Sequence, residues 1–445
     1  MNMKKHLGLA CMAHAFFTAG TSMAADWNRA GGDIGDWSVI GNWNGGVPNA
    51  VAATARWKNN NALKNVDLVG GNPPTIGYFY GAANNTTVTL SGGTLNFDET
   101  FDPEHGAYIA PNSHGSGASA KITFNNALSV YNGNGNMRAG GDDGWGTVAG
   151  TVVFANSGNS WNKTFINNSV TVQLGIAGAL PSGTVVTLGN STANTGRWGA
   201  LDLNGNNQTV AGLQVASGNA AGLNNTVTST AAAVLTVNNS RDYTFAGTLA
   251  GAGLGLTKSG SGVLTLTGAN TYGGHTIVGQ GTLKLGVGAL ANTPSITIAS
   301  GATFDVSALA SFTFTGSSPV QTLAGGSSSG VSSVNAGGNT LTLASGALAT
   351  FEANGTDGTV GKISVTGNLT LNANAITINV TGSALAAGTY RLLDCTGTLA
   401  NTGTFGTPTI TGTPLNGATA SISVTAGAAG YIDLVISSGM VFMVL

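Results

Sequence analysis

Residues 260–286 read GSGVLTLTGANTYGGHTIVGQGTLKLG, a stretch in which short apolar runs alternate with turns of glycine and asparagine. In 264–266 (LTL) and 283–285 (LKL) the aliphatic residues alternate with polar ones, which places the two kinds on opposite faces of an extended strand. Glycine and asparagine favour the tight turns that end such strands. The stretch therefore predicts strand, turn, strand, turn and strand, each strand with one buried and one wet face.

The same alternation recurs along the rest of the chain in short bursts that end at Gly, Asn or Ser. Further examples are Val88-Thr89-Leu90, Ile296-Thr297-Ile298, Leu341-Thr342-Leu343, Ile363-Ser364-Val365, Leu369-Thr370-Leu371 and Ile376-Thr377-Ile378. The composition agrees, because 70 of the 445 residues are glycine, which costs about 1 kcal/mol at each helical position. We therefore expect an all-β chain with no amphipathic helix after Ala25.

Three architectures use short one-sided strands: a β-sandwich, a propeller and a β-solenoid. Single sandwiches rarely exceed about 250 residues, and the chain shows neither linkers nor the period of roughly 40 to 50 residues that propeller blades give. In a parallel β-helix each coil buries its aliphatic face against its neighbours, with small residues and Asn at the corners. We therefore predict a parallel β-helix with about 20–25 residues per coil.

The N-terminus predicts export. Lys4 and Lys5 precede an apolar run too short to span a bilayer, and cleavage is expected at Ala24 or Ala25, so that residues 1–25 form a signal peptide. Its removal leaves 13 basic against 17 acidic residues, a balance too weak to attract nucleic acid or an anionic membrane. We expect an extracellular or cell-surface protein that meets a membrane only during export.

The mature chain divides by composition into a Trp-rich part, residues 26–200, and a Gly-rich part, residues 201–445. All seven tryptophans lie before residue 200, whereas residues 246–445 carry only nine charges. Trp37, Trp43 and Trp57 lie near the start, where a solenoid needs a cap over its first coil. Because aromatic faces also suit pyranose rings, glycan contact is the alternative role for these three.

The stretch at about 251–286 resembles the autotransporter-associated β-strand repeat, also called the passenger-associated transport repeat, of Gram-negative secreted proteins. The residues that carry the resemblance are Gly260, Leu264, Leu266, Gly268, Asn270, Thr271, Tyr272, Gly274, Thr276, Gly281, Leu283 and Leu285. The resemblance implies a right-handed parallel β-helix displayed outside the cell. Residues 201–213, the opening around Trp37 and Trp43, and 388–393 resemble further segments of such proteins. The residues after the repeat do not show the strand pattern of a translocator barrel, so we expect a passenger without its own translocator.

Residues suited to catalysis are few. The densest polar cluster is Asp98, Glu99, Asp102 and Glu104, followed by His105 and His114. Such a cluster could hold a structural Ca²⁺, or supply the acid and base for cleaving a glycan, but a solvated loop is the preferred interpretation. His275 is expected on the surface of a strand, and no cofactor is expected.

The first hypothesis is therefore a non-catalytic, exported structural or adhesion protein. Its expected partners are cell-surface or matrix polysaccharides, or other surface proteins. The alternative is a secreted β-helix enzyme that degrades polysaccharides, a lyase or glycosidase, or a carbohydrate-binding protein.

Overall fold

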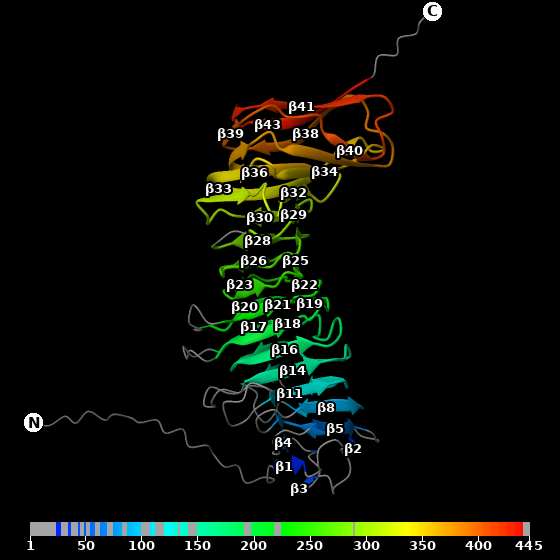
Figure 1. Ribbon diagram of the computed structural model, residues 1–445, viewed down its shortest axis with the longest axis vertical. Coiled ribbons are helices and arrows are strands. Elements are labelled where there is room, and N and C mark those ends of the chain that lie inside the picture. The colour runs from blue at the N-terminus through cyan, green and yellow to red at the C-terminus, as the bar shows by residue number, and fades with distance from the viewer. Residues whose placement is uncertain are drawn as a thin grey trace, which may run out of the picture.

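The structure is a computed structural model, and its strands stack into an elongated column (Figure 1). It describes residues 24–27, 34–36, 43–44, 49, 54–57, 63–68, 74–81, 87–98, 107–111, 120–131, 134–140, 149–190, 197–217, 224–287 and 290–438. Within these ranges the chain consists of strands and turns, and no helix there could span a membrane. Residues 1–23 of the predicted signal peptide lie outside the described residues.

The strands within these ranges form five sheets. Sheet A contains β1 (Ala24–Trp27), β3 (Trp43–Asn44), β4 (Thr54–Trp57), β7 (Tyr78–Gly81), β10 (Ala107–Ala110), β13 (Asn136–Ala139), β15 (Lys163–Ile166), β17 (Val185–Leu188) and β20 (Gly212–Val215). Sheet B contains β2 (Ile34–Asp36), β5 (Leu63–Leu68), β8 (Thr87–Gly92), β11 (Lys121–Phe124), β14 (Gly150–Phe154), β16 (Val170–Leu174), β18 (Gly199–Asp202), β21 (Thr226–Thr228) and β24 (Thr248–Ala250). Sheet C contains β6 (Thr75–Ile76), β9 (Leu95–Asp98) and β12 (Leu128–Tyr131).

The other two sheets run from β19 through the C-terminal half. Sheet D contains β19 (Gln208–Val210), β22 (Ala233–Asn238), β25 (Leu254–Ser259), β27 (Thr276–Val278), β29 (Ser295–Ile298), β32 (Thr322–Gly325), β34 (Leu348–Asn354), β35 (Thr359–Val360), β37 (Ala375–Thr381) and β40 (Thr409–Gly412). Sheet E contains β23 (Tyr243–Phe245), β26 (Val263–Leu266), β28 (Thr282–Leu285), β30 (Thr303–Asp305), β31 (Ser311–Phe314), β33 (Val331–Leu343), β36 (Lys362–Leu371), β38 (Gly388–Cys395), β39 (Thr398–Asn401), β41 (Thr419–Thr425), β42 (Gly427–Ala428) and β43 (Tyr431–Ser437).

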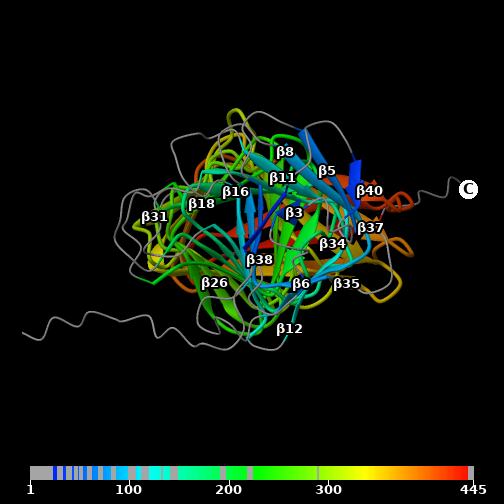
Figure 2. The same ribbon diagram turned by 90° about the horizontal axis from the view of Figure 1, so that it is seen from below.

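Nearly all neighbouring strands are parallel and come from successive coils, so the predicted parallel β-helix is confirmed. Every alternating burst identified in the sequence lies in a strand, and in each the aliphatic residues are buried. Viewed along the axis the coils superimpose, with β31 at one side and β37 and β40 at the other (Figure 2).

Coil length varies along the axis. Leu264 pairs with Leu283 on the next coil, which is a short step along the chain. Phe124 pairs with Phe154 and Val334 with Val365, so the coils there are more than half as long again. The expected coil length therefore holds only for part of the column. Most coils elsewhere are longer, because a third strand or longer corner loops are added to the turn.

A run of short coils forms a narrow region that we call the waist, residues 254–305. Sheet B ends at β24, and a third strand per coil returns only at β31, so that the coils β25–β26, β27–β28 and β29–β30 have two strands each. The waist is visible as the narrow middle of the column in Figure 1. Residues 260–286, from which the fold was predicted, therefore lie in the narrow part of the column.

Inward-facing side chains stack in rows along the axis. One row runs from Leu264 through Leu283, Phe304, Val334 and Val365 to Cys395, and each member is in register with the next. All six are buried, and Cys395 is a free thiol. Because every coil covers the one before it, each row buries apolar surface continuously.

Buried amides satisfy backbone groups at the corners between sheets. The Nε2 of Gln321 donates to the carbonyls of Leu290 (2.7 Å) and Thr293 (2.9 Å), while its Oε1 accepts from the Thr315 N–H (2.9 Å). Gln208 bonds the N–H and C=O of Leu180 in the same way, both at 2.9 Å. Where the chain turns, such bonds replace the backbone hydrogen bonds between strands. They are needed because a buried backbone group without a partner destabilises the fold.

Antiparallel strands close both ends. At the N-terminal end β3 pairs antiparallel with β1, with Trp43 opposite Trp27 in the backbone register. At the C-terminal end β43 lies antiparallel between β38 and β41. The predicted boundary at residue 200 falls inside β18, where the coils continue without a break.

Candidate functional surface

The repeat occupies four strands of the waist, and its buried polar groups form a hydroxyl chain that links two coils. The Tyr272 hydroxyl lies 2.6 Å from Thr276 Oγ1, which lies 3.2 Å from Thr293 Oγ1, and the last donates to the Gly274 carbonyl (2.6 Å). All three side chains are buried, and desolvation raises the pKa of Tyr272 well above its usual range. The network joins coils and has no titratable group suited to catalysis near neutral pH.

Lys258 is fully buried inside the same coil. Its Nζ donates to the carbonyls of Ser259 (3.0 Å), Gly260 (2.8 Å) and Gln280 (3.1 Å), and so bridges one corner to the next coil. Burial lowers the pKa of Lys258 to about 8, although the nearby Asp242 carboxylate acts in the opposite direction. All three N–H groups of the Lys258 ammonium are used, so the residue holds the corner at Ser259 and Gly260 to the next coil at Gln280.

Glycine is required in the repeat where one coil lies directly on another. A Cβ at Gly268 would lie 2.0 Å from the Gly247 carbonyl oxygen of the coil below. Beside it, Asn270 accepts the Leu249 N–H (2.9 Å) and donates to the Gly268 carbonyl (2.9 Å). Both motif residues thus serve to stack coils.

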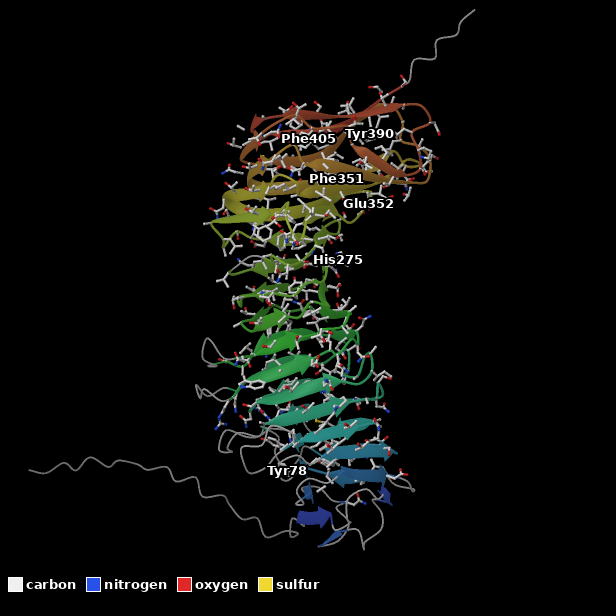
Figure 3. All side chains as sticks on the ribbon, in the orientation of Figure 1. Tyr78, His275, Phe351, Glu352, Tyr390 and Phe405 are labelled. Atoms are coloured by element: carbon white, nitrogen blue, oxygen red, sulfur yellow. The ribbon has the colours of Figure 1, made fainter. Side chains whose placement is uncertain are left out.

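His275 is exposed on the narrow part of the column, as predicted, but it lies just before β27 and not within a strand (Figure 3). Its Nδ1 lies 2.7 Å from Ser295 Oγ on the following coil. No carboxylate among the described residues bonds this pair, and no cluster of three His, Cys, Asp or Glu occurs in the described part of the chain. A Ser–His nucleophile needs an orienting acid, and none is placed at this pair by the described part of the chain.

A row of aromatic and cationic side chains crosses the outer face of sheet A, within residues 26–200. Tyr78, Tyr108, Arg138 and Phe165 are in register on four successive strands. The rings of Tyr78 and Tyr108 stack with centroids 5.3 Å apart, and Arg138 Cζ lies 5.7 Å from the Tyr108 centroid and 4.7 Å from that of Phe165. Tyr108 and Arg138 are 2% and 8% exposed, whereas Tyr78 and Phe165, at the ends of the row, are half-buried.

This row could not be recognised from the sequence alone. Its members lie about one coil apart, so no local pattern connects them, and only a known coil length would have aligned Tyr78 with Tyr108. Because the planar groups cover one another, the row has cation–π and stacking contacts of its own. Because Tyr108 and Arg138 are buried, a ligand would meet only the two ends of the row, at Tyr78 and Phe165.

The acidic cluster is described only at its first residue. Asp98 ends β9 and is buried, in register with Tyr131. Glu99, Asp102 and Glu104, together with His105 and His114, lie outside the described residues. A structural Ca²⁺ at this cluster therefore stays a prediction.

The predicted glycan-contact tryptophans are placed only through their backbones. Trp43 lies in β3 and Trp57 in β4, both in sheet A, while Trp37 lies outside the described residues. Their sheet is the one that carries the row of Tyr78, Tyr108, Arg138 and Phe165. Ala24 and Ala25, at the predicted cleavage site, begin β1.

The repeat is also found by comparison with known families. Residues 256–285 match the model of the passenger-associated-transport-repeat. The match covers β27 and β28, most of β25 and all of β26. No curated protein matches the chain.

Proposed function

We infer, from a parallel β-helix that carries a passenger-associated transport repeat, that this chain works outside the cell as a non-catalytic structural or adhesive rod. The observation that carries this proposal is that the matched repeat is built into the continuous stack of coils. Its characteristic residues Gly268, Asn270 and Tyr272 are used for coil stacking, and His275 has no catalytic partner among the described residues.

Surface labelling of intact bacteria that express the full chain tests this function. Protein made with its predicted signal peptide should become accessible to antibody and protease on unbroken cells, whereas protein made without that segment should stay inside. Retention of both forms in the cytoplasm would contradict an extracellular role. Release of oligosaccharides from pectin or alginate by the purified protein would instead identify the enzyme alternative.

Carbohydrate binding is the second candidate, favoured by the aromatic–arginine row on sheet A. The half-buried rings of Tyr78 and Phe165 at the two ends of the row supply accessible aromatic surface, which suits sugar rings. We expect Phe165→Ala to weaken binding to an immobilised polysaccharide. Ile277→Ala, at an exposed apolar residue of sheet D in the waist, is the matched control and should bind as the parent does. Equal binding by both variants would exclude the row as a glycan site.

A further inference from the structure

The C-terminal strand β41 is an open edge of sheet E. It pairs with β43 on one side through seven residues, from Thr419 opposite Ser437 to Thr425 opposite Tyr431. No described residue forms a strand pair with its other side. A row of backbone N–H and C=O groups is therefore left for another strand.

This edge lacks the features that normally prevent strand addition. The sequence of β41 is TASISVT, seven residues with no charge, proline or glycine. The end strand of sheet D, β40, has four residues and is flanked by Pro408 and Pro414. Prolines and short length block pairing at an edge, so β40 is protected and β41 is not.

The core-side face of β41 is only half covered. Ala420, Ile422 and Val424 are half-buried, whereas the residues opposite them in β43, Ile436, Leu434 and Ile432, are buried. The other face of β41 carries Thr419, Ser421, Ser423 and Thr425, all exposed. One further strand with the same alternation of apolar and polar residues would cover the apolar face of β41 and extend its solvent-exposed face.

The sequence of β41 is chemically symmetric about Ile422. If two copies pair antiparallel with Ile422 at the centre, Thr419 faces Thr425, Ala420 faces Val424 and Ser421 faces Ser423. Each pair matches in polarity, and the absence of charge removes like-charge repulsion. A two-fold interface requires this self-complementarity.

We propose that two copies of this chain join through antiparallel pairing of their β41 strands. The strands of sheet E follow one another along the column axis, so the pairing places two rods end to end with their N-terminal parts outermost (Figure 1). Phe405 and Tyr390 lie at the joined ends (Figure 3).

The chain's own last residues are the other occupant to consider. Residues 440–445 read MVFMVL, with no polar residue in either alternating set. A strand of this sequence would put apolar side chains beside the exposed Thr and Ser face of β41. A second β41 matches both faces, and for that reason it is the better occupant.

A pair of charge variants tests the dimer and its register together. In S421K/S423K a lysine at 421 faces a lysine at 423 of the second copy, at two places about the axis, and the protein should become monomeric. In S421K/S423E the same lysine faces a glutamate, and the dimer should be retained. Because both substituted side chains are exposed, we expect the fold of the monomer to stay unchanged.

Light scattering on the purified full chain measures the molar mass, and so the oligomeric state, of the parent and of each variant. The proposal expects a dimer for the parent, for S421K/S423E and for a chain shortened by residues 440–445, and a monomer for S421K/S423K. A monomeric parent, or a dimer that survives S421K/S423K, would overturn it. If circular dichroism shows that S421K/S423K does not fold, the test rests on S421K/S423E. A dimer of S421K/S423E supports the predicted register, and a monomer contradicts it.

Discussion

At the scale of single residues, the polar groups inside the coil are used as connectors between turns of the helix. Lys258, Tyr272 and Thr276 each bond a neighbouring coil or corner, and each is fully buried or nearly so. Tyr272 and Thr276 are recognisable in the sequence as motif residues, but their role is not. The reason is that a hydroxyl chain through three residues depends on register between coils, which the sequence does not display.

Lys258 makes stability depend on pH in a predictable direction. Its pKa is lowered to about 8 in the folded chain from an ordinary 10.5, so between these values the unfolded chain holds a proton that the folded chain has lost. The free energy of unfolding contributed by Lys258 therefore rises with pH across this window. Urea unfolding at pH 7.5 and pH 10 should show the parent gaining stability relative to Lys258→Met. A difference between the two proteins that stays constant with pH would contradict the lowered pKa.

Thr276 should be sensitive to loss of its hydroxyl. Thr276→Val leaves the buried Tyr272 hydroxyl without its partner, which costs about 1–3 kcal/mol. Thr276→Ser keeps the oxygen and should cost less, so it is the control. Denaturant unfolding midpoints measure both, and equal midpoints for the two variants would show that the hydroxyl chain contributes nothing.

At the scale of elements, strands were predictable and corners were not. Alternating residues such as those of 264–266 mark a buried and a wet face directly, so strand positions follow from the sequence. Coil length depends instead on corner loops and on whether a third strand such as β31 is added, and local alternation carries no information on either. The row on sheet A is the feature least predictable from the sequence. Its members come together only through the register between strands that lie a full coil apart.

The C-terminal cap depends on β43, whose Leu434 is fully buried between β38 and β41. Leu434→Ala should cost about 2–5 kcal/mol and loosen the end of the column first. Val435→Ala, at the neighbouring half-buried position, is the control and should cost much less. Hydrogen exchange should speed up in β38 and β41 of Leu434→Ala and stay unchanged in β14 and β16. Uniform loss of protection along the whole chain would mean that the cap does not unfold separately.

At the scale of the whole molecule, the composition predicted the architecture because a solenoid is a sum of similar coils. The high glycine content and the sparse charge of residues 246–445 both follow from faces that stack closely, as at Gly268 on Gly247. End strands are the exception to this regularity. The cap and the open edge of β41 could not be predicted, since both arise where the repetition stops.

Removal of one whole coil should leave a folded protein. Val263 pairs with Thr282, so deletion of 263–281 brings β28 onto the place of β26 with its register intact. Deletion of one residue more, 262–281, shifts Leu283 and Leu285 to the wet face, and that chain should unfold at a much lower temperature. Thermal unfolding followed by circular dichroism compares the two. Equal melting of both deletions would show that register is not what holds the waist.

The waist also sets how the rod responds to pulling. Tension along the axis passes through every junction between coils in series, and the hydrogen bonds of each junction share the load. β27 and β29 pair along three residues and β28 and β30 along three, whereas β33 and β36 alone pair along nine. Under tension we therefore expect the junctions of the waist to open before the junction between β33 and β36, so that the chain lengthens at the waist while the coils of residues 331–371 keep their structure.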